Sequence, residues 1–171
     1  MTATDLSGLY LEDFKVGQRY ESRETYELTQ DRAVAFAREF DPQPFHVDPE
    51  AAKDSLFKGL AASGWMTCAI TMRLLTSSLD IAGGIVGAGG EIAWPNPARP
   101  GQVLRATSEV VEVQASTSRP DRGRITMRTE TKDQDGLVVE ILTARLIVMR
   151  RRAPGHPSRS SPRREERASR N

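Results

Sequence analysis

The fold is decided by residues 63–79, which read SGWMTCAITMRLLTSSL. Ser63 is a favoured N-cap residue, so we expect a helix to begin at Gly64 and to run to about Leu79. A helix that is apolar almost all round is a buried helix. This helix is therefore predicted to form the hydrophobic centre of the domain. Its apolar residues are Trp65, Met66, Cys68, Ala69, Ile70, Met72, Leu74, Leu75 and Leu79.

Shorter elements precede this helix. Alternating residues predict a strand from Arg19 to Leu28. Thr29 then caps a helix that ends at Phe40, because Pro42 disfavours a helical conformation at the residue before it. Asp48 and Pro49 are typical of a helix start, and they predict a further short helix over 50–56.

Four strands are predicted after residue 80. Their ranges are 85–94, 103–115, 124–132 and 137–149, with a hairpin turn at Asp135-Gly136. The glycines of 83–90 permit bending of the first of them. The chain is therefore expected to be an α+β protein, in which a curved antiparallel sheet wraps around one long buried helix.

Length and charge indicate one domain and a tail. A chain of 171 residues, 38% apolar and 27% charged, is typical of one soluble domain, expected here over 1–149. Residues 150–171 hold eight Arg and two Glu, so this segment carries +6 and the rest −5. We expect a disordered tail, because so few apolar residues cannot support folding. Since it lacks interleaved aromatic residues, no nucleic-acid or membrane partner is predicted.

Cys68 is the single cysteine, which excludes an internal disulfide and a cysteine-based metal site. Within an apolar run, it is predicted to be a core residue and not a nucleophile. The first thirty residues contain no apolar leader, and the apolar stretch 64–75 is too short to span a membrane. We therefore expect a cytoplasmic protein without a metal site.

The candidate catalytic segment is Asp41-Pro42-Gln43-Pro44-Phe45-His46. Its two prolines predict a rigid loop that presents a carboxylate and an imidazole together, as acid/base chemistry requires. The alternatives are that Asp41 simply ends a helix and that His46 is a structural loop residue. Gly64 offers a backbone N–H at a helix N-terminus to a substrate carbonyl, although Ser63-Gly64 also fits a simple N-cap.

These motifs resemble the MaoC-like, R-specific enoyl-CoA hydratase branch of the hot-dog fold, over about 17–149. Residues 41–46 are similar to the family's D-x-N-P-x-H loop, with Gln43 in place of Asn. Residues 63–65 stand where the family has H-G-M/L, so Ser63 replaces His. Residues 97–101, Pro-Ala-Arg-Pro-Gly, match its P-x-R-P-G turn.

The resemblance implies hydration of a trans-2-enoyl-CoA thioester, or the reverse dehydration, without a further cofactor. Asp41 is then the base that activates water and His46 the group that orients it and exchanges the proton, or the two roles are swapped. Gly64, Ser63, Phe45 and Trp65 are the expected substrate contacts. A thioesterase and a non-enzymatic acyl-CoA binding protein are the alternatives.

The resemblance also implies a homodimer with one continuous sheet. The predicted strand 137–149 favours this arrangement, because a long apolar strand needs a neighbour on both sides.

Overall fold

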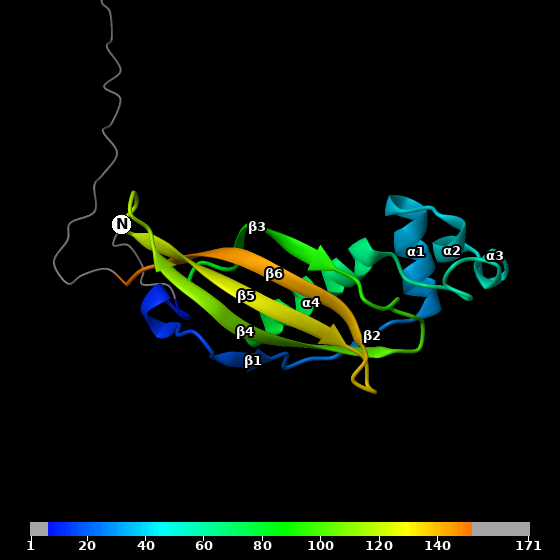
Figure 1. The fold of residues 1–171 in the computed structure, drawn as a ribbon, viewed down its shortest axis with the longest axis horizontal. Coiled ribbons are helices and arrows are strands. Elements are labelled where there is room, and N and C mark those ends of the chain that lie inside the picture. The colour runs from blue at the N-terminus through cyan, green and yellow to red at the C-terminus, as the bar shows by residue number, and fades with distance from the viewer. Residues whose placement is uncertain (1–6, 152–171) are drawn as a thin grey trace, which may run out of the picture.

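The computed structural model describes residues 7–151 (Figure 1). In chain order the elements are η1 (Leu11–Asp13), β1 (Arg19–Glu21), β2 (Tyr26–Glu27), α1 (Gln30–Phe40), α2 (Pro44–Val47), α3 (Pro49–Lys53), α4 (Gly64–Ser78), β3 (Val86–Ala93), β4 (Val103–Ala115), β5 (Arg122–Lys132) and β6 (Val138–Met149).

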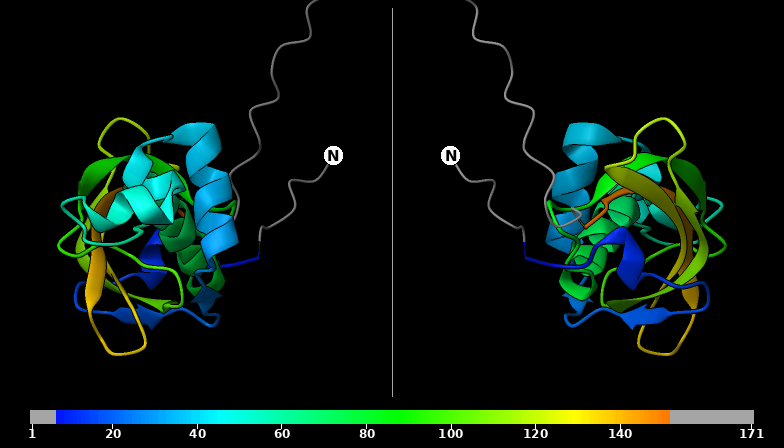
Figure 2. Two further views of the ribbon diagram at one scale, coloured as in Figure 1. Left: turned by 90° about the vertical axis from the view of Figure 1, so that its right-hand side faces the viewer. Right: turned by 90° about the vertical axis from the view of Figure 1, so that its left-hand side faces the viewer.

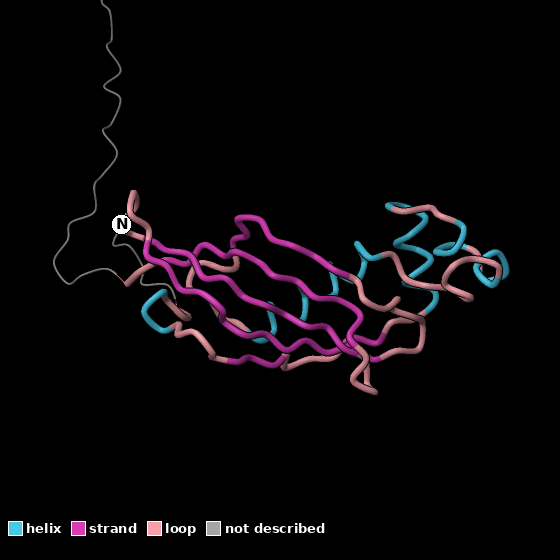
Figure 3. The backbone as a smooth tube through the Cα atoms, in the orientation of Figure 1, coloured by secondary structure: helices cyan, strands magenta, loops and turns pink. Residues whose placement is uncertain are grey.

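The strands form one antiparallel sheet in the order β1-β4-β5-β6-β3, and β2 also pairs with β4 (Figure 3). The sheet curves around α4, as the end-on views of Figure 2 show. Helices α1, α2 and α3 lie together beyond one end of the sheet (Figure 1). The predicted α+β architecture, a curved sheet around one long helix, is thus confirmed, and it is the hot-dog arrangement.

Helix α4 packs one face against the sheet. Met66, Ile70 and Leu74 belong to one buried cluster, and Leu75 and Leu79 to a second. The opposite face is not covered, since Trp65 is 60% exposed and Met72 is 40% exposed. The expectation that the helix is buried all round is therefore wrong for this face of α4.

Buried polar side chains separate the two clusters. The hydroxyls of Thr71 and Thr131 lie 2.6 Å apart, and those of Ser108 and Thr129 lie 2.8 Å apart. Glu140 belongs to the same layer and is fully buried. Hydrogen bonding allows the four hydroxyls to be buried at little cost.

Two predicted elements differ from the structure. The strand expected over 19–28 is split into β1 and β2, because the Ser22 hydroxyl, and no strand carbonyl, accepts the N–H of Ala106 at 3.1 Å. The expected loop includes the helical turn α2, with Pro44 at its first position, where proline is favoured. Asp41 and Gln43 stay outside the helices, as predicted.

The glycine-rich segment forms a bent strand, as expected. The pairing of β3 with β6 shifts register between Gly87 and Gly90. A side chain at Gly90 would lie 2.6 Å from the carbonyl oxygen of Thr143, so glycine is required there. The short helix predicted over 50–56 is also confirmed, although α3 is shorter and ends at Lys53.

The two ends of the described chain meet. Arg150 pairs with Glu12 at 2.8 Å, and Arg151 pairs with Asp13 at 2.6 Å. The first two residues of the predicted tail are therefore held against η1. The remainder of that tail, 152–171, lies outside the described residues. Within 7–151, no helix has the length and apolarity needed to cross a membrane.

Candidate active site

Asp41 and His46 are brought together by the exit of α1 and the turn of α2. The N–H of Asp41 still closes the last turn of α1 by donating to the Ala37 carbonyl at 2.8 Å. The chain then extends and re-enters a helix at Pro44. This path leaves Oδ2 of Asp41 at 3.4 Å from Nε2 of His46.

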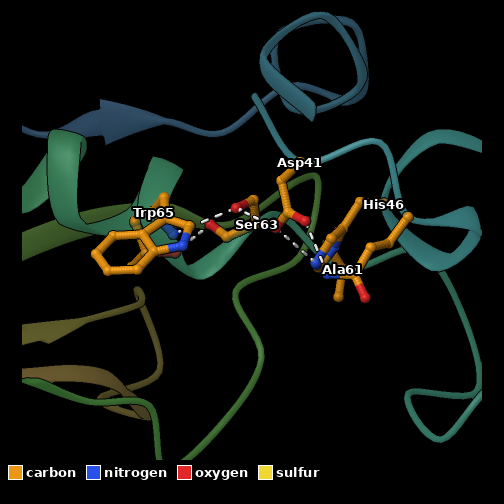
Figure 4. Close-up of polar contacts among 7 residues, drawn as sticks. Asp41, His46, Ala61, Ser63 and Trp65 are labelled. Atoms are coloured by element: carbon orange, nitrogen blue, oxygen red, sulfur yellow. Dashed lines mark hydrogen bonds and ion pairs between the residues drawn. The ribbon is translucent and has the colours of Figure 1, made fainter. Parts of the chain in front are cut away.

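Two neighbours fix the Asp41 carboxylate. The Gln43 amide donates to Oδ1 at 2.7 Å. The Ser63 hydroxyl donates to Oδ2 at 2.7 Å (Figure 4). Burial by itself raises the pKa of Asp41, but these two hydrogen bonds and the nearby His46 hold that pKa below its usual value. The site therefore contains an ionised carboxylate at neutral pH.

His46 is almost completely buried, with 6% of its surface exposed. Its Nδ1 lies 2.7 Å from the carbonyl oxygen of Ala61. Because a carbonyl oxygen is an acceptor, Nδ1 must carry the proton of that hydrogen bond. Nε2 is left facing Asp41, and in the neutral ring it is a proton acceptor. The rings of Phe45 and Phe57 pack on the imidazole, with centroids 4.5 and 6.1 Å away.

Gly64 begins α4 directly behind these side chains. Its N–H donates to no group within 7–151, while Ser63 caps the helix by accepting from the N–H of Trp65. A Cβ at Gly64 would lie 2.8 Å from Cε2 of Trp94. The glycine is thus required by the indole ring of Trp94, a neighbour that the sequence did not reveal.

The side chains surround a pocket of about 360 Å³. Four of the predicted residues line it, namely Asp41, His46, Gly64 and Trp65. The other two predicted contacts lie behind the wall: Ser63 is fully buried, and Phe45 packs against the pocket-lining Phe57.

Phe57 and Trp94 were missed by sequence reasoning, because each reaches the pocket from a segment without a catalytic motif. Phe57 lies in the loop after α3. Arg99 holds that loop by donating to the carbonyl oxygens of Phe57 and Leu60. The Pro-Ala-Arg-Pro-Gly turn therefore supports the pocket wall, which gives its arginine a structural role.

Other reactive groups are poorly placed for chemistry. Burial, followed by the nearby Glu140, raises the pKa of the Cys68 thiol to about 12, so this thiol stays protonated and a poor nucleophile. Within 7–151, no three histidine, cysteine or acidic side chains gather as metal ligands do.

Comparison with known proteins gives the class. The profile of the family described as MaoC like domain matches residues 13–132. The chain belongs to this family.

Its relatives include a protein of Bacillus subtilis (strain 168), the uncharacterized protein YdeM. The two are 32% identical over 127 residues, covering 72% of this chain and 87% of that protein. The crystal structure of a MaoC-like dehydratase from Rhodospirillum rubrum is 52% identical and has a TM-score of 0.83, over 85% of this chain and all of that one. The R-hydratase PhaJ1 from Pseudomonas aeruginosa shares the fold, with 21% identity and a TM-score of 0.66 over 93% of this chain and all of that one.

Proposed function

We propose that the protein adds water across the double bond of a trans-2-enoyl-CoA thioester, or removes it from the 3-hydroxyacyl form. One observation carries the proposal. The Asp41 carboxylate and the His46 imidazole lie 3.4 Å apart in the same pocket as the unbonded N–H of Gly64. Membership of the MaoC-like family and the fold shared with the R-hydratase PhaJ1 support the same reaction class.

The reaction needs a base, a proton donor and an oxyanion site. A water held by Asp41 and His46 gives a proton to one of these two side chains as its oxygen bonds to Cβ of the enoyl group. The electrons of the double bond shift towards Cα, and negative charge develops on the thioester oxygen. Cα then takes a proton from the Asp41–His46 pair, which is thereby returned to its starting state, so that the elements of one water molecule are added overall.

Asp41 is assigned as the base and His46 as the group that orients the water and exchanges the proton. Oδ2 of Asp41 accepts the Ser63 hydroxyl, yet a carboxylate oxygen has room for a second donor. A lowered pKa weakens Asp41 as a base, but it guarantees the ionised form. In the neutral form of the His46 ring, Nε2 is equally placed to accept a proton, so the two roles can be exchanged.

The N–H of Gly64 is assigned to the thioester oxygen. It lies at the N-terminus of α4, where the helix dipole favours negative charge. Trp65 contributes a wall of the pocket. Ser63 and Phe45 are assigned to hold Asp41 and His46 in place, in preference to direct substrate contact.

Hydration of crotonyl-CoA tests the proposal, because the enoyl absorbance disappears as water adds. D41N and H46Q should each lower kcat by about 10²- to 10⁴-fold, the usual contribution of a general acid or base. D48N is the matched control: Asp48 caps α3 outside the pocket, and Asn is an equally good N-cap, so both stability and rate should stay close to the wild type. Release of free CoA would indicate a thioesterase instead. Binding of acyl-CoA without turnover would indicate a binding protein.

We also propose a homodimer, joined through β3 and not through the segment suggested by the sequence. The argument from strand 137–149 is wrong, because β6 already pairs with β5 and β3 of its own chain. All eight residues of β3 are exposed, and this strand ends the sheet. An uncovered strand edge of this length favours pairing with a second copy. Light scattering should give twice the monomer mass of 18.9 kDa, whereas the monomer mass would contradict the proposal.

A further inference from the structure

Trp94 has an unusual position at the end of β3. Its indole ring packs on the α-carbon of Gly64 and meets the ring of Trp65 edge-on, with centroids 5.7 Å apart. The ring also lines the pocket. Although 43% of the residue is exposed, its Nε1–H is directed inward and donates to Oε2 of Glu140 at 3.0 Å.

Glu140 is an unusual partner for this indole. It is fully buried in β6, and its Oε1 accepts no hydrogen bond from the described residues. Burial raises the pKa of Glu140 more than its contacts with Thr71, Cys68 and Trp94 lower it. Burying a carboxyl costs free energy. That cost is understandable if the carboxyl has a task, and its one well-formed hydrogen bond goes to Trp94.

The position of Trp94 limits the pocket. On one side of the indole are Gly64 and the catalytic pair, and beyond its N–H is the buried polar layer that contains Glu140. The pocket measures about 360 Å³, near the lower end of ligand sites, which start at roughly 300 Å³. It must hold the thioester and the attacking water as well as the acyl chain. Little volume remains for a long chain unless the indole moves.

We infer that Trp94 is the residue that restricts this site to short acyl groups, and that Glu140 is the positioning residue that holds the indole in place. The inference rests on the proposed function for the identity of the ligand. It assigns to the Glu140–Trp94 hydrogen bond a role in substrate selection, separate from the chemistry at Asp41 and His46.

Two readouts test the inference on the full-length protein. The first is the affinity for butyryl-CoA and octanoyl-CoA, measured by calorimetry. The second is kcat/KM for the corresponding trans-2-enoyl-CoA thioesters. The wild type should prefer the four-carbon ligand by at least about tenfold in both readouts. A discrimination of this size is usual when a confined pocket must accommodate extra methylene groups.

Four variants separate size from anchoring. For each readout, the value for the eight-carbon ligand is divided by the value for the four-carbon ligand. W94A should raise this ratio by about tenfold or more, since the wall is removed. W94F keeps most of the ring but loses the N–H, and E140L removes the acceptor, so both should shift the ratio in the same direction by less. E140Q should keep the wild-type ratio, because its amide oxygen still accepts from the indole. Leu137→Ala is the control for loss of an exposed apolar side chain outside the pocket.

A folded W94A with an unchanged ratio would overturn the inference, as would a wild type that prefers the eight-carbon ligand. If E140L and E140Q both match the wild type, the positioning role of Glu140 is overturned. Selective binding of the short ligand without any hydration would refute the proposed reaction and leave the role of Trp94 intact. If neither acyl-CoA binds, both proposals fail.

Discussion

The hydroxyl of Ser63 donates to Oδ2 of Asp41 across 22 positions of sequence, at 2.7 Å. The same oxygen atom of Ser63 accepts the N–H of Trp65 and so caps α4. One side chain therefore joins the start of the central helix to the candidate base. The helix N-terminus that is to bind the thioester oxygen and the carboxylate that is to activate water are fixed relative to each other.

This link predicts the effect of S63A on the carboxylate. Burial raises the pKa of Asp41, and the Ser63 hydroxyl is one of the groups that lower it below the usual value. Without that hydroxyl the pKa should rise in the folded protein. Titration of the Asp41 carboxyl carbon by NMR measures the change directly. S116A, which removes a hydroxyl bonded within a distant turn, should leave the Asp41 pKa where it is.

The same variant predicts a change in stability with pH. Because the folded-state pKa of Asp41 is lowered, its ionisation stabilises the protein above its unfolded pKa of about 3.9, and this contribution is lost as the pH falls through the folded value. S63A should therefore lose less stability than the wild type on acidification below about pH 4. Urea unfolding at pH 7 and at successively lower pH gives the difference. Equal acid sensitivity of both proteins would contradict the lowered pKa.

Gly64 predicts a steric effect. In G64A the new methyl group would lie 2.8 Å from Cε2 of Trp94, closer than carbon atoms can approach. Either the indole or the start of α4 must move, so we expect crotonyl-CoA hydration to fall by at least about tenfold, as misplacement of a site by fractions of an ångström does. Combining G64A with W94A removes the clash. We expect the double variant to be more active than G64A alone. If its activity is instead reduced by the product of the two single-variant losses, the steric explanation is excluded.

The contacts of Arg99 predict that lysine cannot replace arginine at this position without loss. Its guanidinium donates to the carbonyl oxygens of Phe57 and Leu60 from two nitrogen atoms, whereas an ammonium group lacks this planar geometry. R99K should loosen the loop that carries Phe57 and raise KM more than it lowers kcat, because the wall of the pocket is affected and the catalytic pair is not. Steady-state kinetics with crotonyl-CoA separates the two constants. R119K, on an exposed turn, is the matched control.

Local sequence patterns were sufficient to predict α4, the proximity of Asp41 and His46, and the strands from β3 to β6. Each of these depends on short-range signals: apolar periodicity, capping residues, prolines and a hairpin turn. The Trp94–Glu140 hydrogen bond and the Arg99 contacts join segments about 40 positions apart, and nothing in either segment specifies its partner. The division of residues 19–28 into two strands depends similarly on one hydroxyl, that of Ser22, against Ala106.

The two faces of α4 give a final prediction, on stability. Leu74 is fully buried against the sheet, whereas Met72 is 40% exposed. L74A should cost about 2–5 kcal/mol of unfolding free energy, because it leaves a cavity. M72A should cost less than about 0.5 kcal/mol in a monomer, as is usual for surface positions. Urea unfolding at several protein concentrations tests both values. A cost for M72A that grows with protein concentration would show that a second copy covers the open face of α4, since removal of an interface contact weakens an association that mass action controls.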